Sequence, residues 1–125
     1  MISGDTKRVC IVGAGLSGLV TAKVFLADGF DVDVFEESSE IGGTWNPSRT
    51  YPELRTNDPR EIYRFSDHDY PDSADEYPTA EQVHSYLESY VERFELGPHI
   101  ALDTKVRSVR RSTGTTDRSF RVEVE

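Results

Sequence analysis

The sequence predicts an α/β fold that begins with a parallel strand–helix–strand unit and ends in a β-hairpin. Three observations lead to this prediction. Residues 7–36 place a glycine-rich turn between an apolar run and a helical pattern. Residues 79–96 carry the apolar spacing of one buried helix face. Residues 104–125 alternate between apolar and polar side chains on both sides of a polar turn, which is typical of a hairpin.

The first unit spans residues 7–36. Residues 7–13 are a short β-branched run that ends in glycine, a pattern typical of a buried parallel strand, and we expect Cys10 in its middle to be a buried small hydrophobe. Residues 16–28 then have helical spacing, and residues 31–36 alternate as a second strand. Strand, helix and strand within about 30 residues make a βαβ unit, whose crossover is expected to be right-handed.

The middle of the chain, residues 41–78, is expected to be an irregular loop that faces a ligand. It holds five of the six prolines and shows no sustained period. Its aromatic residues argue against disorder because they need something to pack on, and long ordered loops in compact proteins are usually functional. The helix at residues 79–96 then starts with Thr79 and Gln82 as a capping box and is stopped by Gly97-Pro98.

The hairpin at residues 104–125 differs in charge from the rest of the chain. Residues 105–125 hold six basic and three acidic side chains, a net charge of +3. Because the whole chain has a net charge of −9, the remaining residues carry −12. A solvated sheet face is the simpler interpretation, and docking against an acidic surface of a larger assembly is the alternative. We expect a complementing chain or another copy to cover the open edge of the hairpin.

The composition argues against several classes of function. With 23 acidic and 14 basic side chains, the chain is not expected to bind nucleic acid or an anionic membrane surface. A single cysteine excludes a disulfide framework, and the scattered histidines and the aspartates of residues 67–75 lack metal-ligand spacing, so no metal site is expected. No apolar run is long enough to span a membrane, and no signal-type segment follows Met1, which predicts a cytoplasmic protein.

The turn after the first strand carries a phosphate-binding fingerprint. Its residues, Gly13-Ala14-Gly15-Leu16-Ser17-Gly18, match G-x-G-x-x-G between a predicted strand and a predicted helix. The first glycine permits the tight turn, the second admits a pyrophosphate and the third lets the helix pack on the sheet. Amides at the helix start, where Leu16 and Ser17 lie, can then bind the phosphates.

Glu36 ends the second predicted strand, 18 residues after Gly18. Its carboxylate can accept hydrogen bonds from both hydroxyls of an unphosphorylated ribose and would repel a 2′-phosphate. The sequence therefore predicts an adenine-dinucleotide site, with FAD or NAD favoured over NADP.

A second glycine turn, Gly42-Gly43-Thr44-Trp45, returns to the same end of the sheet. Its small residues can bring further backbone amides to the pyrophosphate. Trp45 is expected either to lie against an aromatic ring of the ligand or to be a core or lid aromatic. The residues leave both alternatives open.

Residues 9–45 resemble the opening of the flavin-containing monooxygenases, which are related to the Baeyer–Villiger monooxygenases. The similarity continues through residues 51–57 and 65–67, the helix from Tyr77 to Leu96, and residues 103–109. The segment Leu54-Arg55-Thr56-Asn57 favours the flavin-containing branch. Nearly the whole chain is covered, in order and with familiar spacing.

The resemblance implies a glutathione-reductase-like two-dinucleotide-binding flavoprotein fold with FAD in its N-terminal domain and NADPH in an inserted domain. In this family NADPH reduces the flavin, O2 forms a C4a-hydroperoxide, and one oxygen passes to a soft nitrogen or sulfur nucleophile. Asn57 would place a catalytic amide beside the isoalloxazine, although Asn57-Asp58-Pro59 alone is typical of a turn. The implied FAD contacts are Gly13, Gly15, Leu16, Ser17, Gly18, Glu36, Gly42, Gly43, Thr44, Trp45 and, through its backbone to adenine, Val106.

Residues 1–125 lack the family's F-x-G-x-x-x-H-x-x-x-W signature and its second glycine fingerprint. We therefore expect the chain to be an incomplete N-terminal part of an FAD-binding domain, without the NADPH domain and inactive alone. A non-catalytic module that binds FAD, NAD or ADP is the alternative, as is an interaction fragment without a ligand.

Overall fold

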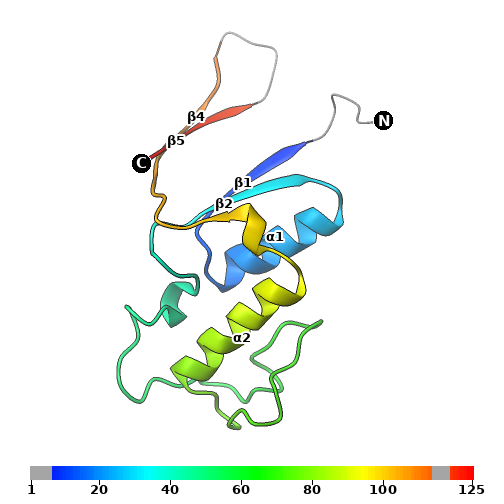
Figure 1. Ribbon diagram of the computed structural model, residues 1–125, viewed down its shortest axis with the longest axis vertical. Coiled ribbons are helices and arrows are strands. Elements are labelled where there is room, and N and C mark those ends of the chain that lie inside the picture. Colours follow the sequence, from blue (N-terminus) through cyan, green and yellow to red (C-terminus); the bar gives the residue numbers. More distant parts are fainter. Residues whose placement is uncertain (1–6, 114–118) are drawn as a thin grey trace.

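The structure is a computed structural model that describes residues 7–113 and 119–125. Its upper part in Figure 1 holds a small parallel sheet, one helix and a hairpin, and its lower part holds the second helix and a long irregular segment. The elements in chain order are β1 (Arg8–Val12), α1 (Leu16–Ala27), β2 (Asp31–Phe35), the 3-10 turn η1 (Gly43–Trp45), α2 (Ala80–Arg93), the 3-10 turn η2 (Gly97–His99), β3 (Ile100–Ala101), β4 (Val106–Arg111) and β5 (Phe120–Val124).

The first sheet has the strand order β1-β2-β3, and all of its pairs are parallel. Arg8 lies opposite Asp31 and Val12 opposite Phe35, which confirms the predicted βαβ unit at residues 7–36. Strand β3 was not predicted, because it has only two residues and so carries no periodic signal. Its place is fixed by pairing, in which Ile100 lies opposite Val34.

Helix α1 packs closely on one face of this sheet. Leu19 and Ala22 of α1 are fully buried and belong to the same core as Ile11 of β1 and Val34 of β2. A Cβ on Gly18 would collide with the carbonyl oxygen of Gly13 and lie 3.5 Å from Cγ2 of Ile11. The absence of a side chain at position 18 therefore allows the close packing that the fingerprint predicts.

The opposite face of β1 is open, so the prediction of a fully buried strand is wrong. Cys10 is an exposed free thiol, and Val12 is 61% exposed. Successive side chains of a strand point to opposite faces, and α1 covers only the face that carries Ile11. The apolar run indicated two covered faces, whereas the described residues cover one.

Helix α2 confirms the predicted N-terminus but ends earlier than expected. The hydroxyl of Thr79 accepts a hydrogen bond from the Gln82 N–H at 3.1 Å, and the Gln82 side chain accepts one from the Thr79 N–H at 3.1 Å. The helix ends at Arg93 rather than at residue 96, because Glu95 leaves the helical region with φ of 53°. Gly97 and Pro98 then belong to η2.

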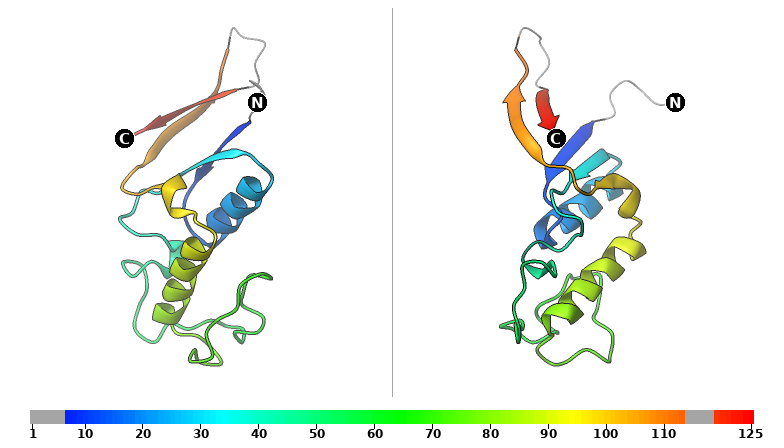
Figure 2. Two further views of the ribbon diagram at one scale, coloured as in Figure 1. Left: turned by 45° about the vertical axis from the view of Figure 1, so that its right-hand side comes forward. Right: turned by 60° about the vertical axis from the view of Figure 1, so that its left-hand side comes forward.

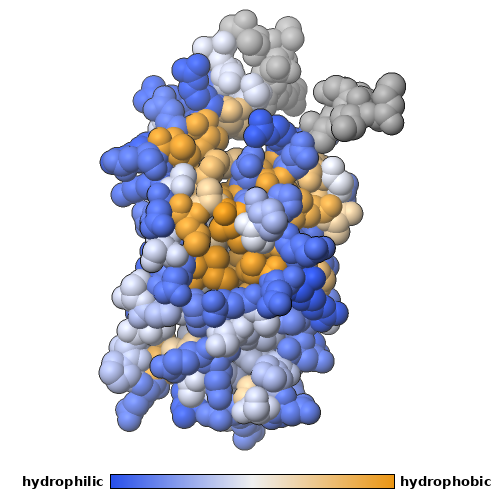
Figure 3. Space-filling view, in the orientation of Figure 1, coloured by the Kyte–Doolittle hydropathy of each residue, from blue (hydrophilic) through white to orange (hydrophobic). Residues whose placement is uncertain are grey.

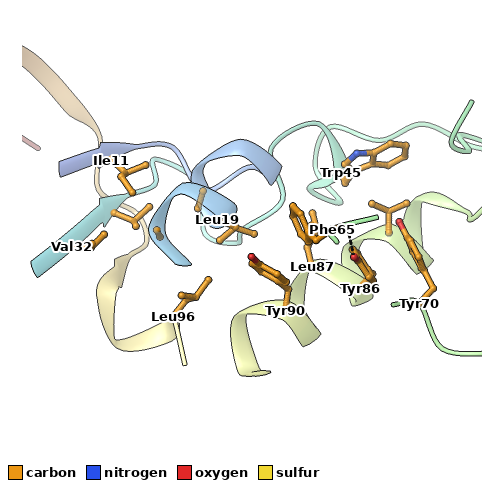
Figure 4. Packing of buried hydrophobic residues seen from close by; sticks show 14 of the residues in the cluster. Ile11, Leu19, Val32, Trp45, Phe65, Tyr70, Tyr86, Leu87, Tyr90 and Leu96 are labelled. Carbon is orange, nitrogen blue, oxygen red and sulfur yellow. Dashed lines mark hydrogen bonds between the residues drawn. The ribbon is translucent and has the colours of Figure 1, made fainter. Parts of the chain in front are cut away.

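The irregular segment is anchored on α2 by aromatic rings, as its composition predicts. Tyr70 stacks on Tyr86 with ring centroids 3.9 Å apart, and the Phe65 and Tyr90 centroids are 4.2 Å apart. The Phe65 N–H also donates to the Tyr86 hydroxyl at 2.8 Å. Figure 4 shows one continuous cluster that runs from Ile11 and the sheet, past Leu19 and Tyr90, to these aromatic side chains.

Strands β4 and β5 form a separate antiparallel pair in which Val109 lies opposite Val122. This confirms the two strands of the hairpin, whose connection at residues 114–118 lies outside the described residues. The hairpin projects away from the body of the molecule in both views of Figure 2. Phe120, Val109 and Val124 are exposed.

On the face seen in Figure 3, apolar side chains gather on this half of the molecule. Figure 3 shows it over the region of the sheet and hairpin, whereas the region of α2 is mostly polar. Among the described residues, no helix is long and apolar enough to cross a membrane.

Candidate dinucleotide-binding site

The turn at residues 13–15 brings the start of α1 to the end of β1. Gly13 has φ of +102°, which glycine adopts without strain, and its N–H donates to the Phe35 carbonyl at 2.8 Å. The first intrahelical bond runs from the Leu19 N–H to the Gly15 carbonyl, so helix geometry leaves the N–H groups of residues 16–18 without an intrahelical partner. No acidic side chain lies in this first turn. The helix start therefore suits an anion such as a phosphate.

The second glycine turn contacts the first one directly. A Cβ on Gly43 would lie 3.0 Å from Cα of Gly15, and a Cβ on Gly15 would lie 3.4 Å from Cα of Gly43. The N–H of Gly42, whose φ is +127°, donates to the Ala14 carbonyl at 2.9 Å. Two turns that are distant in sequence thus form one surface of bare backbone.

Glu36 lies at the end of β2 and is only 4% exposed. One carboxylate oxygen accepts the Ala14 N–H at 2.9 Å and the other accepts the Ser38 N–H at 2.8 Å. Burial alone would raise the pKa of Glu36, but these donors and the nearby charge of Arg49 outweigh it and lower the pKa. The side chain is therefore an ionised carboxylate, and each oxygen keeps a second acceptor position.

Two clefts adjoin at these turns, where Val12, Gly13, Gly15 and Gly43 line both. The first has a volume of about 280 Å³ and is lined further by Phe35, Glu36, Glu37, Arg49, Thr104, Lys105 and Val106. The second has a volume of about 430 Å³ and is lined further by Leu16, Ser17, Gly18, Gly42, Thr44, Trp45 and Tyr63. All eleven residues expected to contact FAD therefore line one cleft or the other.

Two cationic side chains that sequence reasoning missed, Arg49 and Lys105, line the first cleft. Arg49 contacts the Gly43 carbonyl at 3.4 Å and the Ser38 hydroxyl at 3.2 Å. Lys105 lies 3.9 Å from the Glu37 carboxylate. Arg49 lies in the irregular segment outside any motif, and Lys105 lies in the stretch that resembles the family, next to the expected contact Val106, but carried no predicted role. Only the folded arrangement brings them to the cleft.

Trp45 is both a core aromatic and a wall of the second cleft. Its ring is 7% exposed, and its indole N–H donates to the Tyr63 hydroxyl at 3.0 Å. The two rings meet edge to face with centroids 5.9 Å apart. Of the two alternatives for Trp45, the structure shows core packing, and the ring also borders the cleft.

Asn57 lies outside both clefts, where it is exposed in a bend. The buried hydroxyl of Thr56 donates to the Asp58 carbonyl at 2.7 Å and fixes this bend. The local turn that the residues predict is present. A catalytic amide at Asn57 stays a prediction.

The hydrogen-bonded pair of His68 and Ser89 is not arranged as a hydrolytic base and nucleophile. His68 Nε2 lies 2.8 Å from the Ser89 hydroxyl, but its Nδ1 faces a guanidinium nitrogen of Arg93 at 3.2 Å. Arginine only donates, so Nδ1 accepts and Nε2 carries the proton. Burial and then the Arg93 charge also lower the pKa of His68. This imidazole therefore cannot take the Ser89 proton.

Three of the four aspartates of residues 67–75 form separate ion pairs rather than one cluster. Asp67 binds Lys23 at 2.7 Å, Asp69 binds Arg64 at 3.1 Å and Asp75 binds Arg55 at 2.8 Å. The described residues contain no group of three histidine, cysteine, aspartate or glutamate side chains that is placed to hold a metal ion.

Comparison with known proteins gives a consistent set of matches. The family model described as flavin-binding monooxygenase-like matches residues 6–123. Human flavin-containing monooxygenase 1 is 36% identical over 111 residues, which are 82% of this chain and 21% of that protein. The chain spans between 18% and 29% of the length of such curated relatives.

Two solved structures share this fold. An oxidized steroid monooxygenase bound to NADP superposes with a TM-score of 0.84 at 28% identity, over 95% of this chain and 23% of that one. The S-allyl-L-cysteine S-oxygenase of Allium sativum superposes with a TM-score of 0.79 at 29% identity, over 95% of this chain and 34% of that one.

Proposed function

The chain belongs to the flavin-binding monooxygenase-like family, and from this premise we propose that it is the FAD-binding N-terminal portion of a flavin-dependent, NADPH-using monooxygenase. One observation supports this proposal above the others. The residues expected to contact FAD come from four separate stretches of sequence, and all of them line two adjoining clefts.

The shape and chemistry of the clefts fit an extended dinucleotide. The bare backbone at Gly15 and Gly43 and the amides of residues 16–18 suit a pyrophosphate, with the positive charges of Arg49 and Lys105 nearby. The ionised carboxylate of Glu36 suits unphosphorylated ribose hydroxyls and opposes a 2′-phosphate. We place the adenosine end of FAD in the cleft of Glu36 and Val106.

The isoalloxazine end would then extend along the second cleft, past Thr44 and Trp45. When bound, FAD would supply oxygen transfer through its C4a-hydroperoxide to soft nitrogen or sulfur nucleophiles, and similarity to an S-oxygenase supports the sulfur class. Asn57 is our candidate for a catalytic amide in the complete enzyme. No residue of this chain is assigned to NADPH.

We further propose that the 125-residue chain is inactive alone and that a complementing chain or a second copy covers the hairpin. The exposed apolar side chains of Phe120 and Val109, on a hairpin that projects from the body, support a covered state. The cytoplasmic location stays a prediction from the sequence.

The second candidate function is that of a non-catalytic module that binds adenine nucleotides. The cleft around Glu36 favours it, because the side chains that line this cleft suit ribose and phosphate and need no contribution from a flavin ring. This module would accept FAD, NAD or ADP with similar affinity.

Titration of the purified chain with FAD and with ADP by calorimetry separates the two functions. The monooxygenase proposal expects FAD to bind at least about tenfold more tightly than ADP and to raise the melting temperature, since a ligand of the native state stabilises it. Equal affinities for FAD and ADP would favour the module. If neither ligand bound or raised the melting temperature, both functions would be excluded.

A further inference from the structure

We infer that His84, on α2, is a positioning residue of the dinucleotide site, because it holds the peptide group between Ile41 and Gly42 in the orientation that the cradle needs. The effect that we expect on FAD and ADP affinity rests on the proposed function. The sequence offers no motif for this histidine, which in the structure is 8% exposed and faces the second glycine turn.

The imidazole contacts the turn in two ways. His84 Nε2 lies 3.2 Å from the Ile41 carbonyl oxygen, and since a carbonyl only accepts, the nitrogen donates. A Cβ on Gly42 would lie 3.1 Å from Cδ2 of His84, so the ring packs directly against the backbone of Gly42. The histidine therefore supports the turn from the side of α2.

The same peptide group is held at its other end by the fingerprint. The carbonyl that His84 binds and the N–H of Gly42 belong to one planar unit, and that N–H donates to the Ala14 carbonyl at 2.9 Å. Ala14 in turn donates its own N–H to Glu36 at 2.9 Å. A single series of hydrogen bonds thus links α2, both glycine turns and the ribose-binding carboxylate.

Two carboxylates lie beside the ring. His84 Nδ1 lies 3.3 Å from the Glu88 carboxylate, one helical turn further along α2, and Nε2 lies 3.9 Å from the Glu40 carboxylate. The contact of Nε2 with the Ile41 carbonyl, at 3.2 Å, is shorter than either of these two. The imidazole touches neither cleft, so it acts on the ligand only through the turn.

The test compares two substitutions of His84 in the whole chain. His84→Leu keeps an apolar side chain of similar size but removes the donor, whereas His84→Gln retains an N–H that can reach the Ile41 carbonyl. We expect His84→Leu to weaken the binding of FAD and ADP about 3- to 10-fold, the range set by one lost hydrogen bond. We expect His84→Gln to bind both within about twofold of the unchanged chain.

A ligand-independent measurement accompanies the titrations. Hydrogen exchange of the Gly42 amide, followed by NMR, is expected to become at least about fivefold faster in His84→Leu and to stay near its original rate in His84→Gln. Leu96→Ala is the matched control, because Leu96 is fully buried beyond the end of α2 and its loss should lower the melting temperature without changing either readout. His84→Met, a second variant without a donor, replaces His84→Leu if that variant does not fold.

The outcomes separate this inference from the proposed function. An unchanged rate of Gly42 exchange in the variants without a donor would overturn the role of His84, whatever the chain binds. Faster exchange with unchanged FAD and ADP affinities would also overturn it, because His84 would then be structural only. If the unchanged chain bound neither FAD nor ADP, the proposed function would fail, and the exchange rates would still decide whether His84 holds the turn.

Discussion

Gly15 and Gly43 meet backbone to backbone, so that a Cβ on either residue would lie within 3.4 Å of the other's Cα. Gly15 is the N-cap of α1, and Gly43 is the first residue of η1. Their contact joins two turns into one surface and leaves no side chain between the helix start and a ligand. Substitutions at the glycines are therefore the sharpest tests of the site.

Gly15→Val should abolish dinucleotide binding. The added methyl groups would fill the space between the turns and keep a pyrophosphate from the amides of residues 16–18. We expect FAD affinity to fall by at least about 100-fold in calorimetric titration. The control is Gly97→Val, since a Cβ at that position meets nothing within 4 Å. Near-normal FAD affinity in Gly15→Val would show that the fingerprint does not bind the ligand.

Gly18→Ala should destabilise the chain rather than act on the ligand directly. The added Cβ would collide with the Gly13 carbonyl oxygen and force α1 away from β1. We expect a loss of about 1–3 kcal/mol in the free energy of unfolding, measured by urea denaturation. Gly97→Ala, with open space around it, should change this free energy by less than about 1 kcal/mol. Equal stability of the two variants would contradict the close packing of α1.

Glu36 should make the stability depend on pH in the acid range. Its pKa in the folded chain is lowered from the ordinary value of 4.5, so its contribution is complete above pH 4.5 and is lost as the pH falls through the folded pKa. Glu36→Gln should lower the free energy of unfolding at pH 7 by about 1–3 kcal/mol. The difference in the free energy of unfolding between Glu36→Gln and the unchanged chain should shrink below pH 4.5.

Glu37→Gln is the control for this measurement, because Glu37 is the exposed neighbour on the same strand end. Its stability at pH 7 should lie within about 1 kcal/mol of the unchanged chain. A Glu36→Gln difference that stayed constant from pH 7 to below pH 4.5 would contradict the ionised, hydrogen-bonded carboxylate.

Cys10 should react with a thiol reagent in the folded chain, because it lies on the open face of the sheet. Burial first, and then the charge of Asp33, raise the pKa of this thiol above 9.0, so the thiolate is scarce near pH 7. The rate of labelling should rise about tenfold for each pH unit up to that pKa. Labelling only after denaturation would mean that the face is covered in the isolated chain.

Asn57→Ala in the complete monooxygenase should spare FAD binding and reduce oxygenation. Asn57 lies outside both clefts, so FAD affinity should stay within about twofold. Product formation per NADPH consumed measures oxygenation separately from flavin reduction. Asp58→Ala, next to it in the same bend, controls for loss of the turn. Unchanged oxygenation in Asn57→Ala would leave the residue as a turn residue alone.

Local signals predicted the parts of the fold that depend on neighbouring residues. The glycine fingerprint between an apolar run and a helical pattern, followed by the alternation of residues 31–36, predicted the βαβ unit, and the capping box predicted the start of α2. Those signals act within a few residues of chain, so they can be recognised without tertiary contacts.

The features that sequence reasoning missed depend on distant partners. Strand β3 exists because Ile100 pairs with Val34, and Cys10 is exposed because nothing described covers its side of β1. Arg49 and His84 reach the site only through folding, since a lone basic side chain in a loop or on a helix has no spacing to recognise. The eleven expected FAD contacts come from motifs and a family resemblance that can be recognised in the sequence. Their roles stay predictions.

The register of the hairpin places Arg110 directly opposite Arg121 on one face, while Val109 and Val122 share the other. Two like charges side by side weaken the pairing slightly, and a second hairpin laid on that face would gather four arginines. This repulsion discourages the fibril-like stacking to which projecting strands are prone. The arginine pair therefore disfavours face-to-face stacking of two hairpins, whereas the valine face offers apolar contact to another chain.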